Sequence, residues 1–176
     1  MVDTNENISI VPISEKYIES FHKCLETVAS ERKYLGYVDA PSLEDTRENI
    51  ITHIQRNTPR YIAIKDKEVV GWCEVLPNQL EGFRHSGKIN TMGIAEAYRG
   101  QGIGKKLMTA TLQAAEKFGM ERVELLVYAS NVDAIGFYEK NGFVCEGTKK
   151  KARKLDGEYD DVNIMAIFLN PEPWNA

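Results

Sequence analysis

A run of closely spaced glycines between a predicted strand and a predicted helix constrains the fold most. Residues 98–106 read Tyr-Arg-Gly-Gln-Gly-Ile-Gly-Lys-Lys, after a strand-like stretch and before apolar residues at helical spacing from Ile103 to Phe118. Glycine lets a backbone come close to a ligand, and the first N–H groups of a helix have no partner within it. The segment therefore predicts a phosphate or pyrophosphate site. The alternative is a turn that the glycines merely shape.

The spacing of these glycines does not fit two common phosphate motifs. A P-loop needs Ser or Thr after its lysine, whereas Lys106 follows Lys105 here. The dinucleotide fingerprint needs Gly-x-Gly-x-x-Gly and an acidic residue about 20 positions later. Glu121 and Glu124 are near that distance, but the glycines at 100, 102 and 104 are spaced differently. A nucleotide-binding regulatory domain would rest on the glycine loop alone.

The other patterns predict an α+β, or mixed α/β, domain. Apolar periodicities and turn residues give the order β-α-α-β-β-β-α-β-α-β-β, which mixes hairpins with at least one strand-helix-strand crossover. We expect one domain over residues 1–176, with frayed ends at about 1–7 and 170–176. The predicted strands cover residues 8–11, 60–65, 69–76, 88–94, 121–128, 143–149 and 161–169, and the predicted helices begin at Ser14, Ser42, about Ile103 and Asn131.

Composition excludes several classes of protein. With 43% hydrophobic residues, 27% charged residues and a net charge of −4, the chain is neither disordered nor basic enough for duplex binding. No apolar run approaches the roughly 20 residues of a membrane span, and the polar start is no signal peptide. We therefore expect a cytoplasmic protein without nucleic-acid or membrane partners. The basic run Lys149–Lys154 is interpreted as a solvated hairpin end, although it could also be a nucleic-acid patch or bind the phosphate of a ligand.

Cysteines and histidines give no sign of a metal site or a disulfide framework. The three cysteines are far apart among apolar residues, which predicts buried, reduced thiols. The three histidines occupy separate segments, so we expect no metal. The residues concerned are Cys24, Cys73, Cys145, His22, His53 and His85.

Two segments resemble signatures of the GNAT superfamily, the Gcn5-related N-acetyltransferases. The pattern Arg99-x-x-Gly102-x-Gly104 resembles that family's acyl-coenzyme A pyrophosphate loop, and Met-Gly-Ile at 92–94 precedes it as the family's fourth strand does. Residues 131–143 resemble the second signature, Asn-x-x-Ala-x-x-Phe-Tyr-x-Lys-x-Gly-Phe. The two motifs stand in the family's order, with one helix and one strand between them.

The resemblance covers about residues 8–169, and it implies both fold and reaction. The GNAT fold is a central, mostly antiparallel sheet of about seven strands flanked by four helices. Its members pass an acetyl group from acetyl-CoA directly to an amine, without a metal, and a homodimer is one assembly to expect. The closing segment 154–161, followed by Met165, resembles the branch that acts on amino acids, protein N-termini and related amines.

The resemblance also assigns residues to the acetyl-CoA site. Loop amides would hold the pyrophosphate, the fourth strand would pair with the pantetheine arm, and Asn131 would orient its thiol end. Tyr138 matches the family's general acid, because a phenol is protonated at neutral pH and can give its proton to a thiolate; alternatively it is a core aromatic. The predicted cosubstrate residues are Met92, Gly93, Ile94, Arg99, Gly100, Gln101, Gly102, Ile103, Gly104, Lys105, Asn131 and Tyr138.

Several carboxylates compete for the role of base. Glu74 lies on the third strand, where relatives place a carboxylate near the acceptor, so it is our candidate for the base and for acceptor binding. Glu31, after the first helix, is a second candidate for acceptor binding. The ordinary alternatives are a solvated strand residue and an exposed helix-end charge. Glu124 and His85 are further candidates for proton transfer.

We expect the acceptor to be a small primary amine, such as an amino acid or an analogue of one. A protein N-terminus or a lysine side chain is the alternative within the same enzyme class. A non-catalytic acyl-CoA sensor is the rival outside it.

Overall fold

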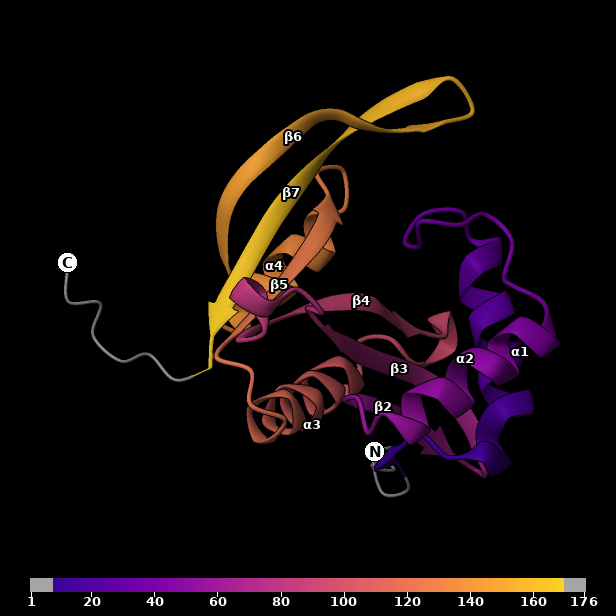
Figure 1. The fold of residues 1–176 in the computed structure, drawn as a ribbon. Coiled ribbons are helices and arrows are strands. Elements are labelled where there is room, and N and C mark those ends of the chain that lie inside the picture. The colour runs from indigo at the N-terminus through magenta and orange to yellow at the C-terminus, as the bar shows by residue number, and fades with distance from the viewer. Residues whose placement is uncertain (1–7, 170–176) are drawn as a thin grey trace. The chain divides into compact units, whose positions relative to one another are not determined.

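The computed structural model describes residues 8–169 and confirms the α+β prediction (Figure 1). Seven strands form one sheet in the order β1-β2-β3-β4-β5-β7-β6, mostly antiparallel, with β4 and β5 parallel. The strands are β1 (Ser9–Pro12), β2 (Arg60–Lys65), β3 (Glu68–Pro77), β4 (Ser86–Ile94), β5 (Arg122–Tyr128), β6 (Val144–Leu155) and β7 (Glu158–Phe168); the helices are α1 (Ile18–Ser30), α2 (Leu43–Gln55), α3 (Ile103–Lys117) and α4 (Val132–Lys140). The expected frayed ends lie outside the described residues.

The described chain divides into two compact units. The first contains the residues through Val75 together with Thr91–Phe118, and the second contains Leu76–Asn90 and the residues from Gly119 onward. Strands β3 and β4 belong partly to each unit. The single domain expected over residues 1–176 stays a prediction.

An apolar core fills the first unit. The predicted stripe of α1 is buried at Ile18, Phe21, Leu25 and Val28, so the helical periodicity identified the core face correctly. Helix α2 begins as predicted, because the Ser42 hydroxyl accepts a hydrogen bond from the N–H of residue 45 at 3.1 Å. Trp72, which is fully buried, meets the Phe21 ring edge to face at 5.5 Å between centroids.

Gly93 is required by the packing of Trp72. A Cβ built on Gly93 would lie 2.4 Å from the indole atom Cη2, closer than real contacts allow. The indole is held in place, because its Nε1 donates a hydrogen bond to the Thr91 hydroxyl at 3.0 Å. The glycine of the Met-Gly-Ile segment therefore has a packing role, independent of any ligand.

Replacing Gly93 with alanine should lower the free energy of unfolding by about 1–3 kcal/mol, as expected when a methyl group is forced into a packed core. Denaturant unfolding would measure the change. Gly147→Ala is the matched control, since Gly147 also lies in a strand but has open space around its Cα. Equal stability of Gly93→Ala and the wild-type protein would contradict this account of the packing.

The second unit is dominated by the hairpin of β6 and β7 (Figure 1). Its turn has positive φ at both Asp156 and Gly157, 50° and 89°, as the Asp-Gly pair predicts. Both strands extend further toward the turn than predicted, because the basic run has no apolar alternation to mark it as a strand. Ion pairing supports this part of the hairpin, with Lys150 Nζ 2.9 Å from an Asp161 carboxylate oxygen. The lysines of the run are exposed, as expected for a solvated hairpin end.

Two expectations about burial need correction. Cys24 and Cys73 are buried, and burial raises the pKa of both thiols to about 12. Cys145, however, is exposed, because β6 is the edge strand of the sheet. Apolar Leu126 and Tyr128 on the second face of the strand at 121–128 predict a central strand that is covered on both faces. Strand β5 is an inner strand of the sheet, yet Leu126 is 41% exposed.

Candidate active site

The glycine loop forms an open, electropositive helix start in the first unit. Gly100 and Gly102 have φ of +74° and +76°, and no atom lies within 4 Å of a Cβ built on either. The first helical hydrogen bond runs from the Lys106 N–H to the Gly102 carbonyl at 3.3 Å. The N–H groups of residues 103–105 therefore have no acceptor within α3. A space free of side chains beside these N–H groups suits a phosphate or pyrophosphate.

Arg99 is tied to the protein by an ion pair that the sequence did not reveal. Its guanidinium donates two hydrogen bonds to the Glu31 carboxylate, at 2.8 and 2.5 Å, which raises the pKa of Arg99. Its Nε donates to the Ile94 carbonyl at 2.9 Å, and it lies 4.8 Å from the centroid of the Tyr34 ring. The structure thus brings two predicted residues together, Glu31 and Arg99, as partners of each other.

The side chain of Gln101 stabilises the same loop. Its side-chain Nε2 donates a hydrogen bond to the Ala97 carbonyl at 3.0 Å. Its buried Oε1 accepts no hydrogen bond from the described residues. One end of this side chain therefore stabilises the turn, while the other offers an acceptor inside the loop.

Glu74 lies in a buried ion pair in the first unit. The residue is 1% exposed, its Oε2 accepts a hydrogen bond from Arg60 Nη2, and its Oε1 accepts one from the Thr91 hydroxyl at 2.9 Å. Burial lowers the pKa of Arg60 to about 10, so the guanidinium is still charged at neutral pH. This setting differs from the solvated strand face considered above.

His53 is a neutral neighbour of that pair. Its Nε2 lies 3.8 Å from the Glu74 carboxylate, and its Nδ1 is 2.6 Å from the Thr58 hydroxyl. Burial, with the charge of Arg60 next, lowers the pKa of His53 to about 4. At neutral pH the imidazole therefore adds no positive charge beside Glu74, and the guanidinium of Arg60 supplies the charge that faces this carboxylate.

The residues of the second motif lie on α4 and at both of its ends, in the second unit. Asn131 caps the helix, with its Oδ1 accepting from the Ala134 N–H at 3.2 Å. Tyr138 is half-buried and packs edge to face against Phe137 and Phe143, with centroids 5.4 and 5.7 Å away. Both candidates thus have a structural role, and their parts in catalysis stay predictions.

The parallel pairing of β4 and β5 is short. Within the second unit, residues 86–88 pair with residues 122–124, so that Lys88 stands opposite Glu124. Both strands continue beyond this pair. The parallel pairing therefore covers the first three residues of each strand.

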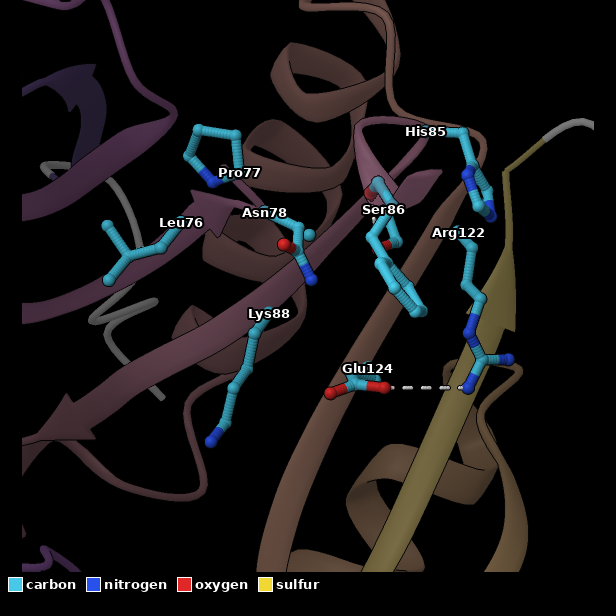
Figure 2. A pocket seen from close by; sticks show the side chains of 10 residues that line it. Leu76, Pro77, Asn78, His85, Ser86, Lys88, Arg122 and Glu124 are labelled. Carbon is cyan, nitrogen blue, oxygen red and sulfur yellow. Dashed lines mark hydrogen bonds and ion pairs between the residues drawn. The ribbon is translucent and has the colours of Figure 1, made fainter. Parts of the chain in front are cut away.

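A pocket of about 510 Å³ lies at this pairing, entirely within the second unit (Figure 2). It includes the alternative candidates for proton transfer, His85 and Glu124. Arg122 Nη2 is 3.6 Å from the Glu124 carboxylate, and its guanidinium also donates to Glu146 at 2.7 and 2.5 Å. The lining residues are Leu76, Pro77, Asn78, Phe83, His85, Ser86, Gly87, Lys88, Arg122 and Glu124.

Most of the lining was not identified from the sequence. One signal was present: in β5, charged Arg122 and Glu124 alternate with buried Val123 and Leu125, which places the two charges on one face. The partners on the end of β3 and on the following loop carry no comparable pattern.

Two kinds of feature are absent from the part of the chain that the structure describes. Residues 8–169 include no group of three His, Cys, Asp or Glu side chains that could hold a metal ion. None of the helices in this part of the chain combines the length and apolar character needed to cross a membrane.

Comparisons with known proteins agree with the motifs. The acetyltransferase (GNAT) family model matches residues 20–143. The ribosomal-protein-serine acetyltransferase of Escherichia coli (strain K12) is 22% identical over 97% of this chain and 98% of that protein. The L-amino acid N-acetyltransferase AaaT of the same strain is 32% identical over 60% of this chain and 65% of its own length.

The fold is also similar to that of solved structures. The structure of yncA, a putative acetyltransferase from Salmonella typhimurium with its cofactor acetyl-CoA, superimposes with a TM-score of 0.87. The match covers 97% of this chain and 99% of that one at 14% identity. At this identity the likeness concerns the fold.

Proposed function

Because the chain belongs to the GNAT family of acetyltransferases, we propose that it transfers the acetyl group of acetyl-CoA to the primary amine of a small molecule. The observation that carries this proposal is the glycine loop, an open helix start with no atom within 4 Å of a Cβ built on Gly100 or Gly102. A pyrophosphate fits there in charge and in space. The 32% identity to an L-amino acid N-acetyltransferase supports a small acceptor.

The loop would hold the cosubstrate through backbone groups rather than through Arg99. The N–H groups of Gly102, Ile103, Gly104 and Lys105 would face the pyrophosphate, because they precede the first helical hydrogen bond. The Arg99 guanidinium would keep the loop in shape, since Glu31 already balances its charge. Glu31 would then support the binding of acetyl-CoA, through Arg99, instead of the binding of the acceptor.

The reaction requires one proton to leave the acceptor ammonium before attack and one to reach the departing sulfur. The neutral amine forms a C–N bond to the thioester carbon, the C–S bond breaks, and the second amine proton is released. Tyr138 would protonate the thiolate. Glu74 is a poor base, because Arg60 and Thr91 already occupy both of its oxygens. Glu124, which lines a pocket and is 43% exposed on its side chain, is the better candidate.

Acetylation of a protein N-terminus is a second candidate function. It is favoured by one observation, the match to a ribosomal-protein-serine acetyltransferase over 98% of that protein. A peptide acceptor would present a neutral amide where a free amino acid presents a carboxylate.

An acceptor panel tests the proposal. The purified protein would be incubated with acetyl-CoA and with amino acids, amines or N-terminal peptides, and free coenzyme A would be measured with a thiol reagent. We expect release of thiol with small primary amines. Release with peptides alone would favour the second candidate, and no release with any acceptor would favour an acyl-CoA sensor.

Replacing Tyr138 with phenylalanine should lower kcat by about a hundredfold, the smaller end of the range for loss of a general acid. Acetyl-CoA affinity should change little, because the ring and its packing are kept. Steady-state kinetics and calorimetry would measure the two quantities. Phe137→Leu, which alters a neighbouring ring without removing a hydroxyl, is the control. Full activity of Tyr138→Phe would remove the phenol from the mechanism.

A further inference from the structure

We infer that the pocket of the second unit binds an α-amino acid with an uncharged side chain, its ammonium at Glu124 and its carboxylate at Lys88. The inference rests on the proposed function and specifies its acceptor. It starts from the parallel register, in which Lys88 and Glu124 are directly paired. Figure 2 shows their side chains on neighbouring strands that border one pocket.

A lysine and a glutamate on neighbouring strands suit a ligand that carries both a negative and a positive charge. Neighbouring strands lie about 4.8 Å apart, and paired residues project from the same face of a sheet. An α-amino acid carries its ammonium and its carboxylate on one carbon, so a site for it needs both charges close together. The pair Lys88 and Glu124 supplies that arrangement, whereas a simple amine would use only Glu124.

The other charges of the pocket leave this pair available. The Arg122 guanidinium is engaged by the Glu146 carboxylate at 2.7 and 2.5 Å, while Glu124 is a more distant partner at 3.6 Å. Glu124 can therefore accept an ammonium without breaking the shorter pair. Lys88 forms no ion pair with any other of the described residues, so its charge is available for a carboxylate.

The rest of the lining selects among amino acids. Leu76, Pro77 and Phe83 give the pocket an apolar side. Glu124 is the one carboxylate of this lining, and Lys88 and Arg122 would repel a second ammonium. Diamines and polyamines are therefore disfavoured. The volume of about 510 Å³ is within the usual range of roughly 300–1,000 Å³ for small-molecule sites.

Glu124 would also serve as the base of the transfer, because it lines the pocket and its side chain is 43% exposed. Glu124 would take one proton from the bound ammonium, which leaves a neutral amine to attack the thioester. The same carboxylate would thus bind the acceptor and act as its base.

A matched substrate series tests the inference. L-Leucine, L-leucinamide and 3-methylbutylamine share one side chain, but only leucine has a carboxylate. Methionine and phenylalanine would each be compared with the corresponding amide and amine in the same way. We expect kcat/KM at least tenfold higher for one of these amino acids than for its amide and its amine. Lys88→Met should lower kcat/KM for that amino acid by about 10- to 100-fold, the range for a lost charge-assisted hydrogen bond. Its amine should be unaffected.

Two further variants and one binding measurement complete the test. Glu124→Gln should lower kcat/KM for all acceptors, and Lys149→Met, an exposed lysine of β6 outside the pocket, should change none. Calorimetry would follow the three amino acids binding to wild-type protein and to Lys88→Met. Circular dichroism would verify that the variants are folded.

The outcomes separate the inference from the proposed function. Acetylation of acids, amides and amines at equal rates, unchanged in Lys88→Met, would overturn the inference and leave the proposed function intact. Lys88-dependent binding of an amino acid without any acetyl transfer would support the pocket and overturn the proposed function. Absence of both would overturn both.

Discussion

Replacing Gly102 with glutamate should abolish acetyl-CoA binding, with a loss of affinity of at least about a thousandfold. The new carboxylate would stand at the start of α3, where a bound pyrophosphate needs empty space beside the helix N–H groups. It would repel the phosphates, and it would strain a backbone with φ of +76°. Calorimetric titration with acetyl-CoA measures the effect directly.

Gly157→Glu provides the control for this variant. Gly157 also has positive φ, 89°, and open space at its Cα, but it lies in the turn between β6 and β7. It reproduces the backbone strain and the added charge away from the glycine loop. We expect it to bind acetyl-CoA normally. Undiminished binding by Gly102→Glu would show that the loop is not the pyrophosphate site.

Replacing Glu74 with alanine should lower the free energy of unfolding by about 3–5 kcal/mol, because it leaves one member of a buried ion pair without its partner. Arg60 is 5% exposed, and its Nε and Nη1 already lack a hydrogen-bond acceptor among the described residues. After the substitution, the Asn49 side chain, 2.8 Å from Nη2, would still accept a hydrogen bond from Arg60 but would not balance its charge. Chemical denaturation would measure the loss.

Glu146→Ala is the matched control. Glu146 forms a bidentate ion pair with Arg122, and the Glu146 side chain is 40% exposed. An exposed pair contributes about 0–1 kcal/mol, so this variant should be nearly as stable as the wild-type protein. A second substitution, Glu74→Gln, tests whether this carboxylate takes part in catalysis. A Glu74→Gln protein of normal stability but very low kcat would show that Glu74 is the base.

Patterns that depend on neighbouring residues predicted most of the fold. The apolar stripe of α1, the Ser42 cap of α2 and the Asp156-Gly157 turn each follow from a few adjacent residues, and the structure confirms all three. The two signature motifs likewise identified the family, because each is contiguous in the sequence. Local spacing carries this information without knowledge of the tertiary contacts.

The partners of charged side chains could not be predicted in this way. Arg99 and Glu31 are 68 positions apart, and neither has a local feature that identifies the other. Glu74 was predicted to be a base near the acceptor or, alternatively, a solvated strand residue, and neither interpretation includes a buried ion pair. Its burial depends on Arg60, which lies on a different strand. The pocket in the second unit escaped prediction for the same reason, because its lining comes from three separate stretches of chain.

The ion pair between Glu31 and Arg99 has a consequence for protein engineering. A designer who exchanges the segment after α1 to change acceptor preference would also remove the carboxylate and the Tyr34 ring that support Arg99. If the glycine loop holds acetyl-CoA as proposed, loops taken from relatives would weaken acetyl-CoA binding whenever they lack a matching acid. In a chimera of this protein and a relative, residues 31–34 and residue 99 should therefore be exchanged together.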